Sequence, residues 1–247
     1  MFGYRRYILL LRHLLITIEM KKLLLTCCFI VASITVFAQY YGNNNYPVIT
    51  FGVSGGSNFA FLNPTSPYRS SVLLDAEQPF SLGVNADIRF NDYFSIRPGL
   101  SYAGKGGTLN AIYGDSQLNT VSVYDDYRLH YLEIPVDFIG HLPIGNSGAN
   151  IFLGGGPYFS LGLSGRNLQS FYNQDPTLYK VTYGRNGDFK SMDVGATTVM
   201  GFQAGRGWAI SANLEFGLNN IMQNNTTGFD ASQLKTFTFY LSIGQSF

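Results

Sequence analysis

Seven charged residues could act together, because even spacing within extended segments places their side chains on one face. Among them, Glu133 and Asp137 form a pair of carboxylates four residues apart, the equipment that a glycoside hydrolase uses. The seven charges could instead neutralise one another inside the protein, and such buried networks are far commoner than catalytic carboxylate pairs. We therefore expect a charge network of Asp87, Arg89, Arg97, Glu133, Asp137, Asp193 and Glu215.

Two histidines beyond residue 38, His130 and His141, are candidates for acid–base chemistry. A serine hydrolase needs a histidine within hydrogen-bond reach of a serine and of an orienting acid. These two lie at opposite ends of one predicted strand, so we expect no joint site, and we place His130 at the rim of that strand. The sequence GGG at 154–156 lies within a strand with no helix after it, which indicates a strand kink rather than a phosphate cradle.

The first 47 residues are expected to precede the folded domain. Residues 1–19 stand before an internal Met20 and are interpreted as an upstream start assigned in error. Residues 20–38 combine two lysines, an apolar stretch of about 14 residues and a plausible cleavage site before Gln39, which is typical of a secretory signal peptide and too short to span a membrane. Both cysteines lie inside this segment, so no thiol or disulfide chemistry is expected in the mature chain. Residues 39–47 form a short leading segment.

The composition is unusual for a soluble protein. Only 13% of the residues are charged, about half of the ~25% typical of soluble domains, whereas glycine (28), tyrosine (17) and phenylalanine (20) are abundant. Leaving out the five basic residues and one acidic residue of positions 1–38 from the 16 basic and 15 acidic residues gives a net charge near −3. This charge excludes the basic footprint of a nucleic-acid-binding protein. We expect no cofactor, no metal site and no enzyme activity.

Apolar and polar residues alternate with a period of two in eight segments, which predicts strands. The stretch 80–102 shows the pattern twice, with a tight turn between, and predicts a hairpin. Its two runs keep the same face apolar only if Phe90 and Phe94 oppose each other across a three-residue loop, a register that places Asp87 opposite Arg97. The predicted strands are 48–60, 80–90, 93–103, 127–140, 150–163, 189–203, 208–218 and 235–247.

Long and short connections alternate along the chain. The connections 61–79, 104–126, 164–188 and 219–234 are long, whereas 91–93, 141–149 and 204–207 are shorter. An even number of strands with sorted loops favours an all-β fold, an eight-stranded antiparallel up-and-down transmembrane β-barrel. The apolar faces would then contact outer-membrane lipid, the small polar faces would fill the lumen, and both termini would lie on the periplasmic side of a bacterial (Gram-negative) outer membrane.

Four motifs within residues 48–247 resemble the PorT-like family of small outer-membrane β-barrel proteins. They are YLEIPVDFIG at 131–140, LGGGPYFSLGL at 153–163, FKSMDVGATTVMGFQAG at 189–205 and the terminal FYLSIGQSF. The resemblance implies a signal peptide, an eight-stranded barrel and insertion by the barrel assembly machinery, which would read the C-terminal strand and its final aromatic residue, Phe247. It implies little about activity.

We expect a non-catalytic protein with a structural or surface-interaction role, exercised through its long outer loops. An extracellular ligand or protein partner is left open. The first alternative is a narrow channel or a component of a protein secretion or transport system. The second alternative is a barrel-embedded lipid hydrolase.

Overall fold

The computed structural model describes residues 47–65, 79–114, 120–145, 147–171, 175–223 and 233–247, with the side chains of 65, 110–114, 120–123 and 171 left aside. The predicted N-terminal extension 1–19, the signal peptide 20–38 and nearly all of 39–47 lie outside these residues. Asn45–Ser246 form one compact unit. None of the described residues belongs to a helix long and apolar enough to cross a membrane.

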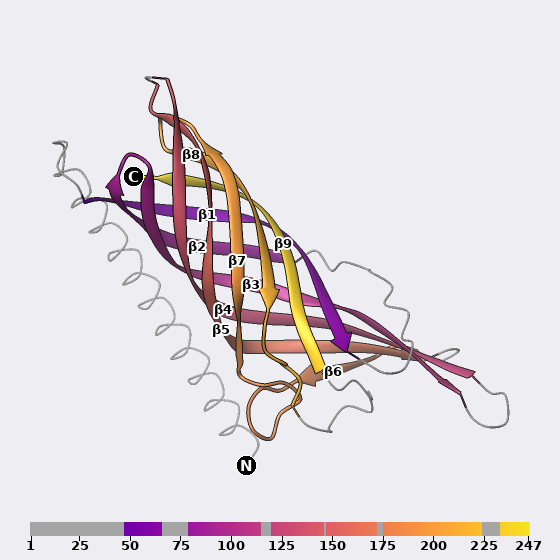
Figure 1. Cartoon of the computed structure of the whole chain (residues 1–247). Helices are drawn as coiled ribbons and strands as arrows, with labels where there is room; N and C mark the ends of the chain where they lie inside the picture. The colour runs from indigo at the N-terminus through magenta and orange to yellow at the C-terminus, as the bar shows by residue number, and fades with distance from the viewer. Residues whose placement is uncertain (1–46, 66–78, 115–119, 146, 172–174, 224–232) are drawn as a thin grey trace, which may run out of the picture. The chain divides into compact units, whose positions relative to one another are not determined.

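Nine strands run through the described residues, and every paired strand is antiparallel to its neighbour. They are β1 (Val48–Thr65), β2 (Phe80–Asn91), β3 (Phe94–Gly114), β4 (Thr120–Ile144), β5 (Ala149–Phe171), β6 (Thr177–Val181), β7 (Met192–Gln203), β8 (Trp208–Gly217) and β9 (Gln233–Ser246). The order β4-β3-β2-β1-β9-β8-β7-β5, together with the β4–β5 pairing, closes a ring of eight strands (Figure 1). Each of the eight predicted segments overlaps one strand of this ring.

The two ends of the ring differ. The short connections 92–93, 145–148 and 204–207 lie at one end, which we call the turn end, and the opposite end of the ring is called the loop end. The ninth strand, β6, was not predicted and lies within the expected loop 164–188. It pairs with Gly165–Gln169 of β5, beyond the part of β5 that pairs with β7, and therefore extends the sheet at the loop end.

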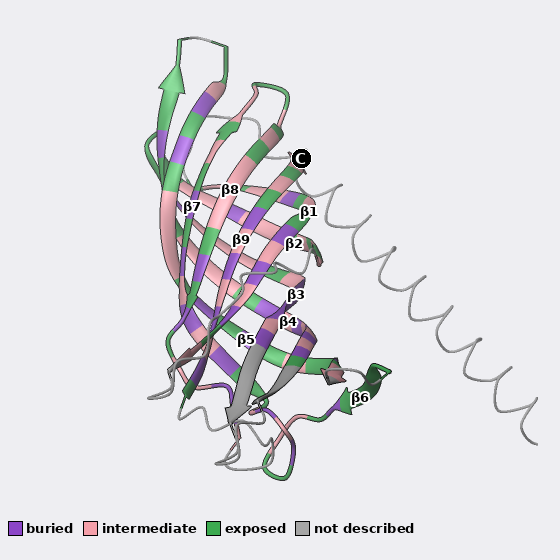
Figure 2. Cartoon of the chain, turned by 90° about the vertical axis from the view of Figure 1, so that its right-hand side faces the viewer, coloured by how far each residue is buried: buried purple, intermediate pink, exposed green. Residues whose placement is uncertain are grey.

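Apolar residues face outward through most of the ring, and small or polar residues face inward. The outward side chains of Leu82, Leu153 and Ile210 are each at least 59% exposed, whereas the inward Ser95, Ser160 and Thr238 are fully buried. Exposed and buried residues consequently alternate along the strands (Figure 2). This part of the ring, in which the outward side chains are apolar, is called the belt below.

Strands β3, β4 and β5 run at least seven residues further at the loop end than the sequence predicted. The expected loop 104–126 is mostly strand, since β3 and β4 stay paired from Gly104↔His130 to Gly114↔Thr120, and β5 also continues past 163. The alternation continues there with its polarity reversed. The apolar Leu109, Tyr127 and Leu129 face inward, and the charged Asp126 and Arg128 face outward. A prediction that relies on outward apolar residues therefore ends the strands where the outward residues become polar. We call residues 104–114, 120–129, 164–171 and 177–181 the extension.

An apolar core fills the ring at the loop end, where the extension begins. It receives side chains from β1, β3, β4, β6 and β9 and from the connections before β7 and after β8. Phe189 is fully buried within it and meets the Tyr127 ring edge-on at 5.4 Å. The core consists of Leu62, Leu109, Tyr127, Leu129, Tyr131, Val181, Phe189, Ile221, Met222 and Leu234.

The β2–β3 hairpin has the predicted register with a modified turn. Asn85↔Gly99 and Ile88↔Ile96 both match a register that sets Asp87 opposite Arg97. The expected three-residue loop is instead a two-residue turn at 92–93 with a bulge between Arg89 and Asn91. The Asn91 side chain accepts a 2.9 Å hydrogen bond from the backbone of Tyr93, which closes the turn, and the rings of Phe90 and Phe94 stack outside at 6.1 Å.

Candidate functional site

The structure places all seven predicted charges on the inner face of the ring, but six of them form two clusters and Asp137 lies at the cavity between the clusters. The turn-end cluster is centred on Asp87. Its two carboxylate oxygens lie 3.1 Å from Arg89 Nε and 3.4 Å from Arg97 Nε, so the pair expected from the hairpin register is present. Arg89 also donates to Gln203 Oε1 at 3.0 Å, which links β2 to β7 across the interior. The Arg97 guanidinium lies 4.9 Å from the centre of the Phe152 ring.

The loop-end cluster is centred on Lys105, a residue that the sequence reasoning missed. Its ammonium nitrogen lies 2.7 Å from Glu133, 3.1 Å from Glu215 and 3.3 Å from Asp193. Lys105 is 1% exposed, and none of the three acids is more than 5% exposed. Lys105 therefore joins β3, β4, β7 and β8 at one point inside the ring.

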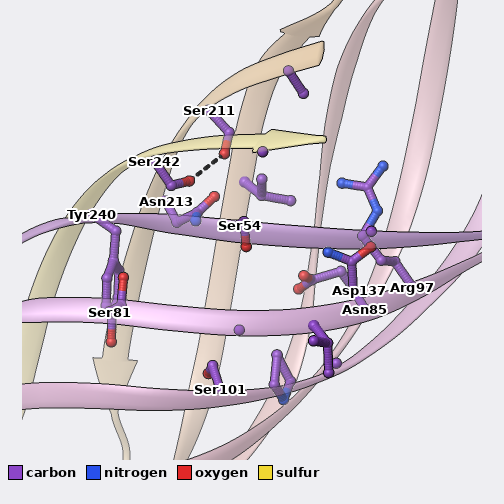
Figure 3. Close-up of a pocket in the computed structure, with 18 of the residues that line it drawn as sticks. Ser54, Ser81, Asn85, Arg97, Ser101, Asp137, Ser211, Asn213, Tyr240 and Ser242 are labelled. Atoms are coloured by element: carbon purple, nitrogen blue, oxygen red, sulfur yellow. Dashed lines mark hydrogen bonds between the residues drawn. The ribbon is translucent and has the colours of Figure 1, made fainter. Parts of the chain in front are cut away.

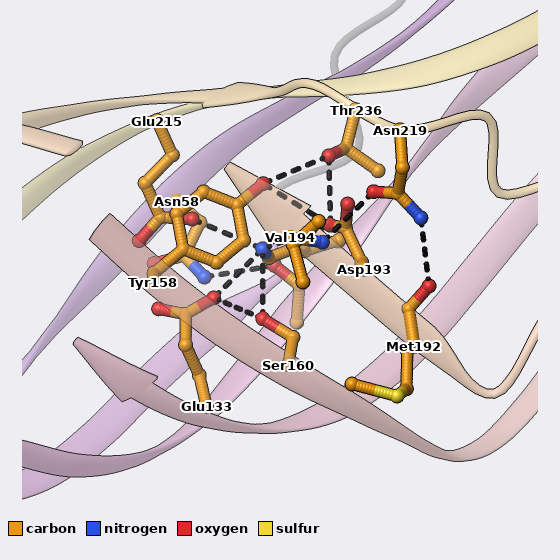
Figure 4. A network of polar contacts seen from close by, with 12 residues as sticks. Asn58, Glu133, Tyr158, Ser160, Met192, Asp193, Val194, Glu215, Asn219 and Thr236 are labelled. Atoms are coloured by element: carbon orange, nitrogen blue, oxygen red, sulfur yellow. Dashed lines mark hydrogen bonds and ion pairs between the residues drawn. The ribbon is translucent and has the colours of Figure 1, made fainter. Parts of the chain in front are cut away.

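Hydroxyl groups complete the loop-end cluster (Figure 4). Ser160 donates to Glu133 at 2.7 Å, Tyr240 donates to Glu215 at 2.6 Å, and Thr236 and Tyr158 donate to Asp193 at 2.9 and 3.2 Å. The Lys105 ammonium also lies 4.1 Å from the centre of the Tyr158 ring. Each charged side chain of the cluster thus has at least two close polar partners, whereas Asp193 Oδ1 is buried without a hydrogen-bond partner.

A simple extension of the alternation would have found Lys105. It lies at an even spacing from Arg97, Ser101 and Ala103, all on the inner face of β3. The predicted strand ended at 103 because GKGG reads as a loop. Gly106 and Gly107 lie within β3 at φ of 149° and 152°, a positive-φ backbone that favours glycine, and a Cβ on Gly106 would lie 2.0 Å from the Tyr127 carbonyl oxygen. These glycines permit close approach of β3 to β4 rather than a turn.

A cavity of about 150 Å³ separates the two clusters (Figure 3). Arg97 and Asp137 line it on the turn side, and Glu133, Glu215 and Tyr240 line it on the loop side. Asp137 stands opposite Arg97 in the β3–β4 register, and its Oδ1 is buried without a hydrogen-bond partner. The remaining polar lining is small and uncharged, and includes Ser54, Ser81, Asn85, Ser101, Thr197, Ser211, Asn213 and Ser242.

The two histidines behave differently from each other. His130 lies on the outer surface, where its ring stacks on Tyr102 and its Nδ1 is 2.6 Å from the Tyr102 hydroxyl, at the upper limit of the belt. His141 lies inside the ring, 2% exposed. Its Nε2 is 2.9 Å from Ser95 Oγ, and its Nδ1 is 3.1 Å from Asn150 Oδ1. This contact could not be predicted from the sequence, because it depends on the β3–β4 and β4–β5 registers.

Ser95, His141 and Asn150 stand in the order of a hydrolase triad, but their bonding differs from one. The single hydroxyl proton of Ser95 is donated to Asp87 Oδ1 at 2.6 Å, so His141 Nε2 is not its acceptor. A triad histidine must take that proton, and a substrate must reach the serine oxygen. Ser95 is fully buried. Ser95, His141 and Asn150 therefore extend the hydrogen-bonded turn-end cluster from Asp87 to β4 and β5.

Within the described residues, no group of three or more histidine, cysteine or acidic side chains is arranged to hold a metal ion. The three carboxylates of the loop-end cluster surround the Lys105 ammonium, which occupies the place that a metal ion would take. The geometry of the interior thus supports ion pairing across the ring rather than metal binding.

Comparison with known proteins assigns the sequence to a family. Residues 33–223 match the family model described as the outer membrane protein beta-barrel domain. No curated protein matches the sequence. Solved structures similar to the chain include Ail of Yersinia pestis in complex with the heparin analogue sucrose octasulfate, OprG of Pseudomonas aeruginosa and the Neisserial surface protein NspA.

The three structures share little sequence with this chain. Ail is 13% identical with a TM-score of 0.37, and the match covers 81% of this chain and 99% of Ail. OprG is 12% identical with a TM-score of 0.41, covering 82% and 98%, and NspA is 13% identical with a TM-score of 0.37, covering 81% and 97%. TM-scores below 0.5 do not establish a common fold, so only the family model assigns the chain.

Proposed function

This chain belongs to the family of outer membrane protein β-barrel domains, and from that premise we propose that its ring of eight strands is a closed, non-conducting and non-catalytic barrel. The belt spans the bilayer, with the turn end in the periplasm and the loop end outside the cell. The protein then acts as a surface-interaction protein through the extension and the long connections. Short turns on the periplasmic side and long loops outside are the arrangement that outer-membrane barrels use.

The observation that carries this proposal is the closure of the interior at the loop end. The Lys105 cluster crosses the lumen from β3 to β7 and β8, and the apolar core, with Phe189 at 0% exposure, lies at the same end. Eight strands enclose only enough room for side chains to fill. Because the interior is closed at the loop end, the proposal assigns function to the outer surfaces.

A photo-cross-linking amino acid placed on the surface tests the proposed role in intact cells. Leu178 of β6 is 62% exposed in the extension, and Leu153 of β5 is 63% exposed in the belt. We expect a probe at position 178 to give discrete adducts with macromolecules at the cell surface, and a probe at 153 to give adducts with lipid alone. Protein adducts at 153 with none at 178 would refute the proposed surface role.

Protease treatment of intact cells tests the orientation. The connections 115–119 and 172–176 should be cut in intact cells, whereas the turns at 92–93 and 204–207 should be cut only after the outer membrane is opened. The reverse pattern would place the extension in the periplasm and would contradict the proposal.

A narrow channel, or a barrel that serves a secretion system, is the first alternative. The central cavity of about 150 Å³ and a mouth of about 500 Å³ at the turn end, bordered by Arg89 and Arg206, favour it. Ionic conductance separates the two proposals, because only a channel conducts.

A lipid hydrolase is the second alternative, and the Ser95–His141–Asn150 arrangement is the observation in its favour. Hydrolysis of phospholipid vesicles by the refolded protein, abolished in Ser95→Ala, would support it. The bonding of Ser95 to Asp87 leads us to expect no hydrolysis above that of the Ser95→Ala variant.

A further inference from the structure

Three cationic residues stand side by side on the outward face of the extension. Arg128 of β4 is directly opposite Arg166 of β5, and Arg166 is directly opposite Lys180 of β6. The inward neighbours Leu129 and Val181 are buried, which sets the three cations on the outer face. Arg166 and Lys180 are exposed, and the Arg128 side chain is 41% exposed. We call these three residues the cationic row.

A row of this kind is unfavourable without an anion. Cross-strand neighbours have Cβ atoms about 4.5–5.5 Å apart, and like charges at that separation destabilise a sheet. Asp126 lies 3.3 Å from Arg128 and forms an ion pair with it. Within the part of the chain that the structure describes, no carboxylate lies within ion-pair distance of Arg166 or Lys180. Arg166 and Lys180 therefore stand beside Arg128 without a carboxylate of their own among the described residues.

A small cavity with an aromatic border lies beside the cationic row. A cavity of about 180 Å³ lies against Arg128 and Arg166 and is bordered by Phe80, Tyr102 and His130. These three rings form a ladder across β2, β3 and β4, with ring centroids 5.3 and 5.6 Å apart. Aromatic side chains that are half apolar and half polar prefer the boundary between the lipid chains and the headgroups.

The row also lies directly above lipid-facing residues. On β5, Leu161 and Leu163 are 46% and 54% exposed, and Arg166 follows Leu163 by about 10 Å along the strand at ~3.3 Å per residue. An anion bound to Arg166 is therefore within reach of a molecule whose apolar chains cover those leucines. Guanidinium groups bind phosphate oxygens through two parallel hydrogen bonds, which matches two neighbouring arginines to phosphate.

We propose that the cationic row, with the aromatic ladder beside it, binds the phosphate-bearing headgroup of a lipid in the outer leaflet. This inference rests on the proposed membrane placement of the belt. The bound lipid would neutralise the row and attach the extension to the membrane surface, so that the extension has a fixed orientation toward its partners.

Vesicles of defined composition test the inference with the full chain. The protein is refolded in phosphatidylcholine alone, in phosphatidylcholine with phosphatidic acid, and in phosphatidylcholine with inorganic phosphate in the buffer. Thermal unfolding and the lipid retained in native mass spectrometry are the two readouts. We expect phosphatidic acid to be retained and to raise the unfolding temperature, with little effect of inorganic phosphate.

Two variants and a matched control give the test its specificity. Arg128→Gln/Arg166→Gln/Lys180→Gln should lower affinity for phosphatidic acid at least about tenfold, because one charged hydrogen bond is worth about that factor. Arg166→Gln alone should show part of the loss if the triple variant does not fold. Lys235→Gln removes an outward cation of β9 that faces Asn63 of β1, and should leave binding unchanged.

Several outcomes would overturn the inference. Equal retention of phosphatidic acid by the triple variant and the native chain would show that the cationic row is not the binding site. Full stabilisation by inorganic phosphate would assign it to a soluble anion. In pure phosphatidylcholine the triple variant should be at least as stable as the native chain, since repulsion is relieved. Because the vesicles present both lipids on both faces, the result does not depend on the orientation or the closed lumen of the proposed function.

Discussion

The belt and the extension differ in which kind of side chain faces the interior. In the belt, Leu153 and Ile210 face outward and Ser160 and Asp193 face inward, whereas in the extension Leu129 and Val181 face inward and Arg128 and Arg166 face outward. The reversal follows the surroundings, because lipid accepts apolar side chains and water accepts charges. One sheet therefore has a polar core held by charge pairing and an apolar core held by the hydrophobic effect.

Replacing Lys105 should produce the largest effect, because the core of the belt depends on charge pairing. Lys105→Met leaves Glu133, Asp193 and Glu215 buried without their cation, and removing one partner of a buried ion pair typically costs about 3–5 kcal/mol. Urea unfolding in lipid vesicles measures the loss. Lys235→Met, at the outward-facing cation of β9, is the matched control and should change stability little. Equal effects of the two would deny that Lys105 supports the core.

Truncating Leu129 tests the apolar core of the extension. Leu129 is fully buried among the residues of that core, and Leu→Ala in a packed core costs about 2–5 kcal/mol. Leu153→Ala, at a leucine that faces outward from the belt, should cost clearly less, because its side chain leaves no cavity. Hydrogen exchange should show the loss at the loop end of β3 and β4. A larger loss for Leu153→Ala would contradict the reversal of faces.

A double-mutant cycle at the turn end measures pairing within the belt. Asp87→Asn and Arg97→Gln should be coupled by roughly 0.5–3 kcal/mol in urea unfolding, as expected for residues in one ion-paired network. Arg89 also contacts Asp87, which makes this effect smaller than the loss of Lys105. The pair Asp87→Asn and Lys235→Gln should be additive. Additivity of the first pair as well would mean that Asp87 and Arg97 do not stabilise each other.

Asp125 should give the smallest effect, a pH dependence confined to the extension. It is 2% exposed and accepts hydrogen bonds from Asn167 at 2.7 Å and Gln169 at 3.0 Å. Burial raises the pKa of its carboxyl above 3.8 despite these bonds. The folded state therefore holds this proton more tightly than the unfolded state, and stability falls as pH rises from 3.8 through the folded pKa.

Asp125→Asn should remove that pH dependence while keeping an oxygen acceptor for the two amides. Hydrogen exchange of the extension between pH 3 and 7 compares the two proteins. A native chain whose protection does not fall across this range, or a variant with the same fall, would contradict the assignment to Asp125.

The belt could be predicted from the sequence, because lipid outside and small polar groups inside give an alternation that runs through each strand. The same phase placed Asp87, Arg97, Glu133 and Glu215 on the inner face before any register was known. The extension could not be found in that way, since Leu129 and Arg128 exchange the faces that Leu132 and Glu133 use. Strand β6 is five residues long and lies in a stretch rich in turn-forming residues, so no period marks it.

Contacts that depend on strand register also could not be predicted from the sequence. Ser95 and His141 are 46 residues apart and meet only because the β3–β4 hairpin has one particular register. Lys105 carried a signal in its spacing, but its glycine neighbours indicated a loop. The single charge network that we expected became two clusters because Lys105 gathers the three acids of the loop end.

Ionic conductance of the refolded chain in planar bilayers tests the closed interior most directly. Insertion is verified first by the shift in gel mobility between heated and unheated samples. With the Lys105 cluster and the apolar core in place, the native protein should insert without discrete conductance steps. Reproducible conductance steps from the inserted native protein would contradict a filled lumen and would favour the channel instead.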